Sequence, residues 1–137
     1  MQMLKALADR CSAIEECYEF MLAYAAQGVT GEEGSGKGGQ IRYFLERAVE
    51  ALSGLGEAYG AALGQSEVYG PFLRVLDRDA GDSLAAIRLV LAQPMISSQL
   101  TDNLNASIHL RALLTDLFLI DEALKKPQSA NQPASAI

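Results

Sequence analysis

The chain has 137 residues, of which 50% are hydrophobic and 20% are charged. A chain of this length buries roughly two-thirds of its unfolded surface, so it can hold one core without a disulfide or a metal, and its apolar content excludes general disorder. Its 11 basic and 17 acidic residues give a net charge of −6, which argues against nucleic acid or an anionic membrane as a partner, because both bind clustered Lys and Arg.

The start of the chain predicts neither export nor membrane insertion. Charged residues are threaded among the apolar ones in MQMLKALADRCSAIEECYEF, whereas a secretory signal needs an uninterrupted apolar core. No run of apolar residues is long enough to cross a bilayer. Cys11 and Cys17 would face roughly 120° apart on one helix, so we expect two reduced thiols rather than a disulfide. These features predict a cytoplasmic protein.

A first helix is predicted from Leu4 to Ala25, where apolar residues recur in steps of three and four. Gly28 stands where the glycine that ends a helix is expected. The segment GEEGSGKGG at residues 31–39 is too rich in glycine for a helix or a strand interior. We therefore expect a glycine-rich interhelical loop over residues 28–39.

Residues 31–38, GEEGSGKG, come within one position of the phosphate-binding loop G-x-x-x-x-G-K-[ST]. Gly38 stands where the magnesium-binding hydroxyl belongs, and the segment follows a predicted helix rather than a buried strand. The pattern therefore indicates a flexible loop and not a nucleotide site. A weaker anion site at the start of the second helix stays open, although two glutamates of the loop oppose it. Its candidate ligands are Gly34, Gly36, Lys37 and Arg42.

A second helix is predicted from near Gln40 through Leu63, antiparallel to the first. It carries Gly56, Gly60 and Gly64 at four-residue spacing, and each interior glycine costs about 1 kcal/mol relative to alanine. Two explanations are open. Either the glycines let a neighbouring backbone approach closely, or the helix frays near Gly54 or Gly64.

Two shorter helices are predicted in the middle of the chain. The first begins at Pro71 or is kinked there, because proline lacks an amide and restricts the residue before it. Ala80 and Gly81 are the predicted joint between the two. Asp82 is the predicted N-cap of the second helix, and Pro94 either ends this helix or starts the next.

The last predicted helix covers roughly Ser97 to Lys125, and apolar residues occupy more than half of its circumference. A groove between two neighbouring helices needs a narrower apolar face, so this helix is expected to be central or shared with a second subunit. Residues 127–137 are predicted to form a flexible polar tail. The candidate interface residues are Leu110, Leu113, Leu117, Phe118, Ile120 and Leu124.

No alternating strand pattern and no internal repeat interrupts this succession of helices. The sequence therefore predicts an all-α fold, an antiparallel up-and-down bundle of four to five helices. It forms a single domain over residues 1–126.

Few residues indicate chemistry. His109 is the only histidine, which excludes a two-histidine metal site or a di-iron bundle within one chain, so no metal or cofactor is expected. A lone helical histidine can accept a phosphoryl group, but the sequence after it is a poor match to phosphotransfer domains, and a structural role is expected. Solvated helix faces away from the apolar stripe are predicted at Glu15, Glu16, Glu19, Glu46 and Glu50, because paired catalytic carboxylates need a pocket.

These observations favour a non-enzymatic interaction protein of the adaptor, regulator or chaperone-like kind. Its expected partner is a second copy of itself, and another protein is a further candidate. An anion or small-ligand sensor that uses the glycine-rich loop is the alternative. Phosphotransfer through His109 is the third hypothesis.

Overall fold

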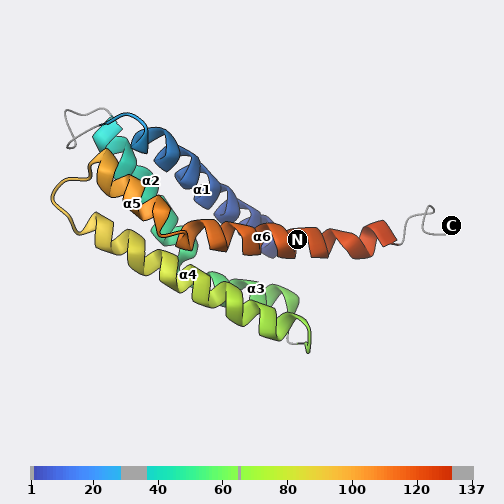
Figure 1. Ribbon diagram of the computed structural model, residues 1–137. Coiled ribbons are helices and arrows are strands. Elements are labelled where there is room, and N and C mark those ends of the chain that lie inside the picture. The colour runs from blue at the N-terminus through green and yellow to red at the C-terminus, as the bar shows by residue number, and fades with distance from the viewer. Residues whose placement is uncertain (1, 29–36, 65, 131–137) are drawn as a thin grey trace.

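The computed structural model describes residues 2–28, 37–64 and 66–130. Helices and short turns make up this part of the chain, and it contains no strand, which confirms the all-α class. The helices number six rather than four to five. They are α1 (Gln2–Ala25), α2 (Lys37–Leu52), α3 (Leu55–Leu63), α4 (Tyr69–Leu91), α5 (Ser98–Ala106) and α6 (His109–Ala130) (Figure 1).

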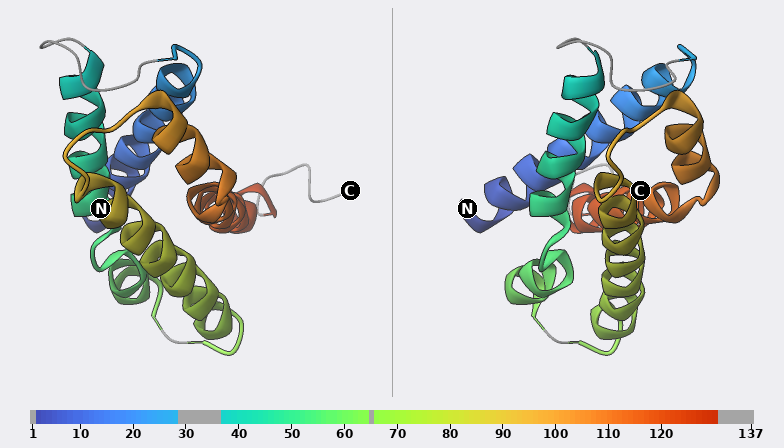
Figure 2. Two further views of the ribbon diagram at one scale, coloured as in Figure 1. Left: turned by 60° about the vertical axis from the view of Figure 1, so that its left-hand side comes forward. Right: turned by 90° about the vertical axis from the view of Figure 1, so that its left-hand side faces the viewer.

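Two helix pairs are joined through α4. α1 packs beside α2, and α3 packs beside α4, which also contacts α2 and α6 (Figure 1). α5 lies on α1, and α6 contacts both α4 and α1. Figure 2 shows α6 nearly end-on while α4 is seen along its length, so α6 crosses α4 at an angle.

The helix predicted from Gln40 through Leu63 is two helices, α2 and α3. Gly54 separates them with a φ of 69°, a left-handed conformation that L-residues with a side chain rarely adopt. Gly64 ends α3 with a φ of 78°, and its amide donates to the Gly60 carbonyl oxygen at 2.8 Å. Helix ends at these two glycines therefore explain part of the glycine spacing.

Close approach explains the position of Gly56. A Cβ atom added there would lie 2.7 Å from the Asp77 Cβ on α4, which is closer than packed carbon atoms come. A Cβ atom added at Gly60 would meet nothing within 4 Å. The two explanations for the glycines thus hold at different positions, and neither accounts for Gly60.

The joint predicted at Ala80 and Gly81 is wrong, because α4 runs unbroken from Tyr69 to Leu91. Asp82 lies inside this helix and caps nothing. A single interior glycine costs only about 1 kcal/mol, and the burial of Leu76, Ala80 and Ile87 along one face of α4 offsets it. Pro71 lies in the first turn, where a missing amide leaves no hydrogen bond unmade.

The single helix predicted from Ser97 to Lys125 is also wrong, because the chain breaks between α5 and α6. Ile108 adopts a φ of 59° at this break, unusual for a β-branched residue. Leu104 and Leu110 belong to different apolar faces of a straight helix, and the break buries both. α6 continues to Ala130, and the rest of the predicted tail lies outside the described residues.

The connection from α4 to α5 is held by polar contacts. The Tyr24 hydroxyl donates to the Ile96 carbonyl oxygen at 2.6 Å, and the Ser98 hydroxyl donates to the Tyr24 carbonyl oxygen at 2.6 Å. The Ser97 Oγ caps α5 by accepting from the Leu100 amide at 3.1 Å. This connection is therefore fixed to the end of α1.

Candidate functional site

A groove of about 510 Å³ lies between α1 and α6. Its walls are four residues of each helix, at positions i, i+3, i+4 and i+7, which is the spacing of one helix face. The lining residues are Glu15, Tyr18, Glu19 and Leu22 on α1, and Arg111, Leu114, Thr115 and Phe118 on α6. We call this site the α1–α6 groove.

The floor of the α1–α6 groove is apolar and two apolar side chains stand at its rim. Leu114 is buried at the floor, and Tyr18 packs partly buried against the core. Leu22 and Phe118 are 48% and 55% exposed, although both are large apolar side chains. Exposed apolar groups that share one groove mark a surface that can be covered by a partner.

The two walls carry opposite charges. Glu15 and Glu19 stand on the α1 wall, and Arg111 stands on the α6 wall. Within the described part of the chain, none of these three side chains forms a hydrogen bond or an ion pair. The neighbouring Glu16 does, because it accepts from Arg47 at 2.9 Å. The charges of the groove are thus free to meet a partner.

Helices α1 and α6 run antiparallel along the groove. Cys11 precedes the groove residues of α1, Asp121 follows those of α6, and both side chains reach the Tyr59 hydroxyl, at 3.3 Å and 3.4 Å. The end of the groove near Tyr59 therefore holds Glu15 and Phe118. Leu22 and Arg111 lie at the other end.

Most of the residues predicted to face a second subunit are covered within the single chain. Leu110, Leu113, Leu117 and Ile120 are buried against the other helices, and Leu124 is partly buried. Phe118 alone of the six is exposed, and it lines the α1–α6 groove. Sequence reasoning missed the α1 wall with Leu22, since a helix pattern does not show which other helix lies beside it. The only sequence signal for this groove is that its lining residues on each helix share one helix face.

The structure describes only two of the four candidate anion ligands. Gly34 and Gly36 lie outside the described residues, and Lys37 is the first residue of α2. The Arg42 guanidinium donates to the carbonyl oxygens of residues 91, 93 and 94, at 3.1, 2.7 and 3.1 Å. These carbonyls lie at and beyond the C-terminus of α4, where the helix dipole favours a cation. Arg42 thus joins α2 to α4, and the anion site stays a prediction.

His109 is the first residue of α6 and its side chain is exposed. It directly follows the break at Ile108. The third hypothesis, phosphotransfer, remains a prediction.

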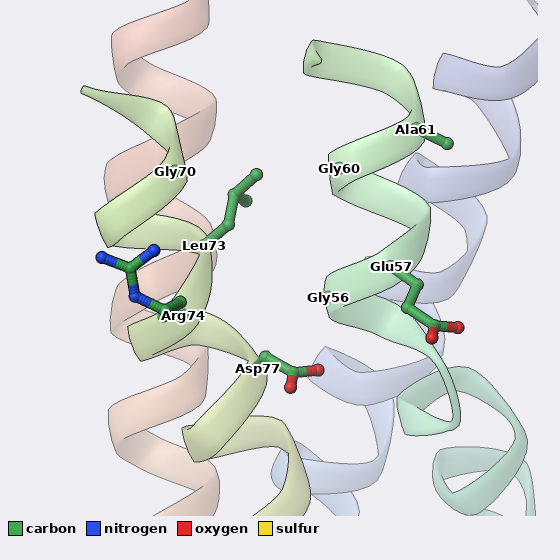
Figure 3. Close-up of a pocket in the computed structure, with 8 residues that line it drawn as sticks. All are labelled: Gly56, Glu57, Gly60, Ala61, Gly70, Leu73, Arg74 and Asp77. Carbon is green, nitrogen blue, oxygen red and sulfur yellow. The ribbon is translucent and has the colours of Figure 1, made fainter. Parts of the chain in front are cut away.

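A second pocket, of about 450 Å³, lies between α3 and α4 (Figure 3). Its charged side chains do not converge. Arg74 points away from α3, Glu57 points away from α4, and Asp77 alone is directed toward Gly56 (Figure 3). A ligand site normally directs a few polar groups at one point. This pocket is a gap between helices that glycines line.

The two cysteines are free and buried. Burial raises the pKa of the Cys11 thiol, and it raises that of Cys17 to about 12. A thiol is a nucleophile only after it loses its proton. Neither cysteine is therefore suited to nucleophilic catalysis at neutral pH.

Metal-ligand clusters and membrane-spanning helices are both absent from the described part of the chain. No three His, Cys, Asp or Glu side chains gather there closely enough to hold a metal ion. None of its helices is both long and apolar enough to cross a bilayer. No protein-family model matches this sequence, and no curated protein or solved structure is similar to it.

Proposed function

We propose that this is a non-enzymatic interaction protein, an adaptor, regulator or chaperone-like protein, that receives a helix in the α1–α6 groove. One observation carries the proposal: Leu22 and Phe118 are exposed on either side of a groove whose floor, at Leu114, is already buried. A helix laid between them would cover both, and aromatic anchors of this kind carry much of the energy of interfaces.

Several features fit this proposal. The packing of α1 against α2 gives the groove a supported wall. The buried thiols and the diverging charges of the α3–α4 pocket offer no reactive centre that would favour an enzyme. We propose the cytoplasm as its location, because free thiols suit a reducing compartment.

The test is photo-crosslinking in living cells. Benzoylphenylalanine is placed at position 118, in the groove, and in a matched variant at position 89. Leu89 on α4 is 66% exposed and lies outside the groove residues. We expect a defined protein adduct from position 118 and none from position 89. Equal labelling from both positions, or no adduct from position 118, would contradict the proposal.

A further inference from the structure

The charges of the α1–α6 groove differ between its two walls. Glu15 and Glu19 lie about one turn apart on the α1 wall, whereas Arg111 lies on the α6 wall, at the end away from Glu15. A helix with basic residues on both edges would be repelled by Arg111, and a helix with acidic residues on both edges would be repelled by the two glutamates. The groove therefore suits a helix whose two edges differ in charge.

On the basis of the function proposed above, we infer that the groove receives an amphipathic helix of another protein, with one basic and one acidic edge. The basic edge carries two Lys or Arg residues one turn apart and lies along Glu15 and Glu19. The acidic edge carries an Asp or Glu beside Arg111. An apolar stripe between the edges covers Leu22 and Phe118. We call this arrangement of charges the two-edge pattern.

The spacing of residues in the groove determines the spacing on the partner. Glu15 and Glu19 are about 6 Å apart along the axis of α1, because four residues of a helix rise that far. A helix that lies along the groove has the same rise, so basic residues at i and i+4 reach both glutamates. Leu22 is about two turns from Glu15 and lies at the same end of the groove as Arg111. The acidic residue therefore belongs about two turns from the first basic one, on the other edge.

The charged side chains of the groove are available to a partner. Among the described residues, the side chains of Glu15, Glu19 and Arg111 form no hydrogen bond or ion pair. Glu16, which does not line the groove, is paired with Arg47 at 2.9 Å. An incoming helix therefore displaces no ion pair that the described residues form.

A second copy of the chain does not complement the groove when two grooves meet face to face. A two-fold axis along the groove exchanges the walls, so the partner's Phe118 would meet Glu15. A two-fold axis across the groove exchanges the ends, so the partner's Leu22 would meet Glu15 and the two copies of Glu19 would approach each other. Both contacts cover a carboxylate with an apolar side chain and supply no counter-charge, which is costly. The charges thus favour a different chain as the occupant.

Selection from a library of displayed helical peptides tests the inference. The library keeps an apolar stripe at i, i+3, i+4 and i+7 and varies both flanking edges among Lys, Glu and Ala. The whole protein is the bait, and we expect the selected peptides to carry Lys on one edge and Glu on the other. Arg111→Glu should change the selected acidic edge to Lys. The double variant Glu15→Lys with Glu19→Lys should change the basic edge to Glu.

The affinity of one selected peptide measures the size of the effect. Arg111→Glu should raise its Kd roughly threefold to tenfold, because an exposed pair of opposite charges becomes a pair of like charges. Replacing the acidic residue of the peptide by Lys should restore binding to this variant. Arg88 on α4 is exposed and lies outside the groove residues, so Arg88→Glu is the matched control and should bind as the parent does. Melting curves verify that every variant is folded.

Three results would overturn the inference: no enriched peptide, the same charge on both edges, or edge preferences that the groove variants leave unchanged. The crosslink from position 118 shows separately whether the proposed function fails. A foreign chain whose crosslinked helix lacks the two-edge pattern would retain that function and reject the inference. An adduct with a second copy of this chain would retain the groove as an interface and reject a foreign helix. The absence of any adduct would reject both.

Discussion

Asp79 on α4 and Asp116 on α6 bring two carboxyl groups together across the interface of the two helices. Two carboxyl groups can share a hydrogen bond only when one is protonated. Burial, this hydrogen bond and repulsion from Asp79 together raise the pKa of Asp116 from 3.8 to about 7. Its Oδ2 atom is buried and has no hydrogen-bond donor within reach among the described residues. The folded protein therefore keeps a proton here near neutral pH.

This proton makes stability depend on pH. The folded state holds the Asp116 proton between pH 3.8 and about 7, where the unfolded chain has released it, so the contribution to stability is lost as pH rises through the folded pKa. Asp116→Asn supplies a permanent donor to Asp79. The change in the free energy of unfolding that Asp116→Asn causes should be more favourable at pH 8 than at pH 5, by roughly 1–2 kcal/mol after solvent screening.

Urea unfolding at pH 5 and pH 8 measures this difference. Asp102→Asn on the exposed face of α5 is the control, and its effect should be the same at both pH values. An Asp116→Asn effect that does not change between the two pH values would show that the pair holds no proton.

Alanine substitutions at two glycines of α3 should have opposite effects. Gly60→Ala fills open space inside a helix, so it should stabilise the fold by up to about 1 kcal/mol. Gly56→Ala would force a Cβ atom against Asp77, so it should destabilise the fold by roughly 1–3 kcal/mol. Thermal melting of both variants checks the prediction, and equal effects would mean that α3 and α4 are not in close contact.

The break between α5 and α6 should favour glycine over alanine. A left-handed residue other than glycine costs roughly 1–2 kcal/mol, and Ile108 has a φ of 59° with an exposed side chain. Ile108→Gly should therefore be about 1 kcal/mol more stable than Ile108→Ala. Urea unfolding measures both variants. In a continuous helix the order would be reversed, so alanine above glycine would indicate an unbroken segment.

The contact of Arg42 with the end of α4 should contribute to stability. Arg42→Met removes the donor to the Gln93 carbonyl oxygen at 2.7 Å and to two others, which should cost roughly 1–3 kcal/mol. Arg42→Lys should recover only part of this stability, because lysine keeps the positive charge but its ammonium cannot bond to several carbonyl oxygens in the fixed fork of a guanidinium. Arg88→Met, at an exposed position, is the control.

Melting with and without phosphate separates this role from anion binding, because a ligand held by Arg42 would raise the melting temperature of the parent only.

Local periodicity was sufficient to predict part of this fold. The stripe from Leu4 to Ala25 predicts α1 nearly to the residue, because burial of one face determines a single long helix. The break at Ile108 could not be predicted, since nothing in its residue type favours a left-handed backbone. It follows from burial of Leu104 and Leu110 together, which is a property of the whole core.

The groove was beyond sequence reasoning for a similar reason. Glu19 was predicted to be solvated, and it is exposed. That it stands on a groove wall depends on α6 crossing beside α1, and helix contacts of this kind are set by segments far apart in the chain. Of the candidate interface residues, Phe118 is exposed and lines this groove, whereas the others were chosen from the apolar pattern without knowledge of what covers them.

The burial of Cys17 makes its thiol a probe of transient opening of the core. Its side chain is 0% exposed on α1, so a thiol reagent reaches it only during the moments when the core separates. With excess reagent, labelling is faster than reclosing, so the labelling rate equals the rate at which the core opens. Cys11, which is 7% exposed near the Tyr59 hydroxyl, reports the same events about one and two-thirds helical turns away. Two rates that agree would mean that this part of α1 opens as one unit, and a faster Cys11 would mean that its N-terminal end opens first.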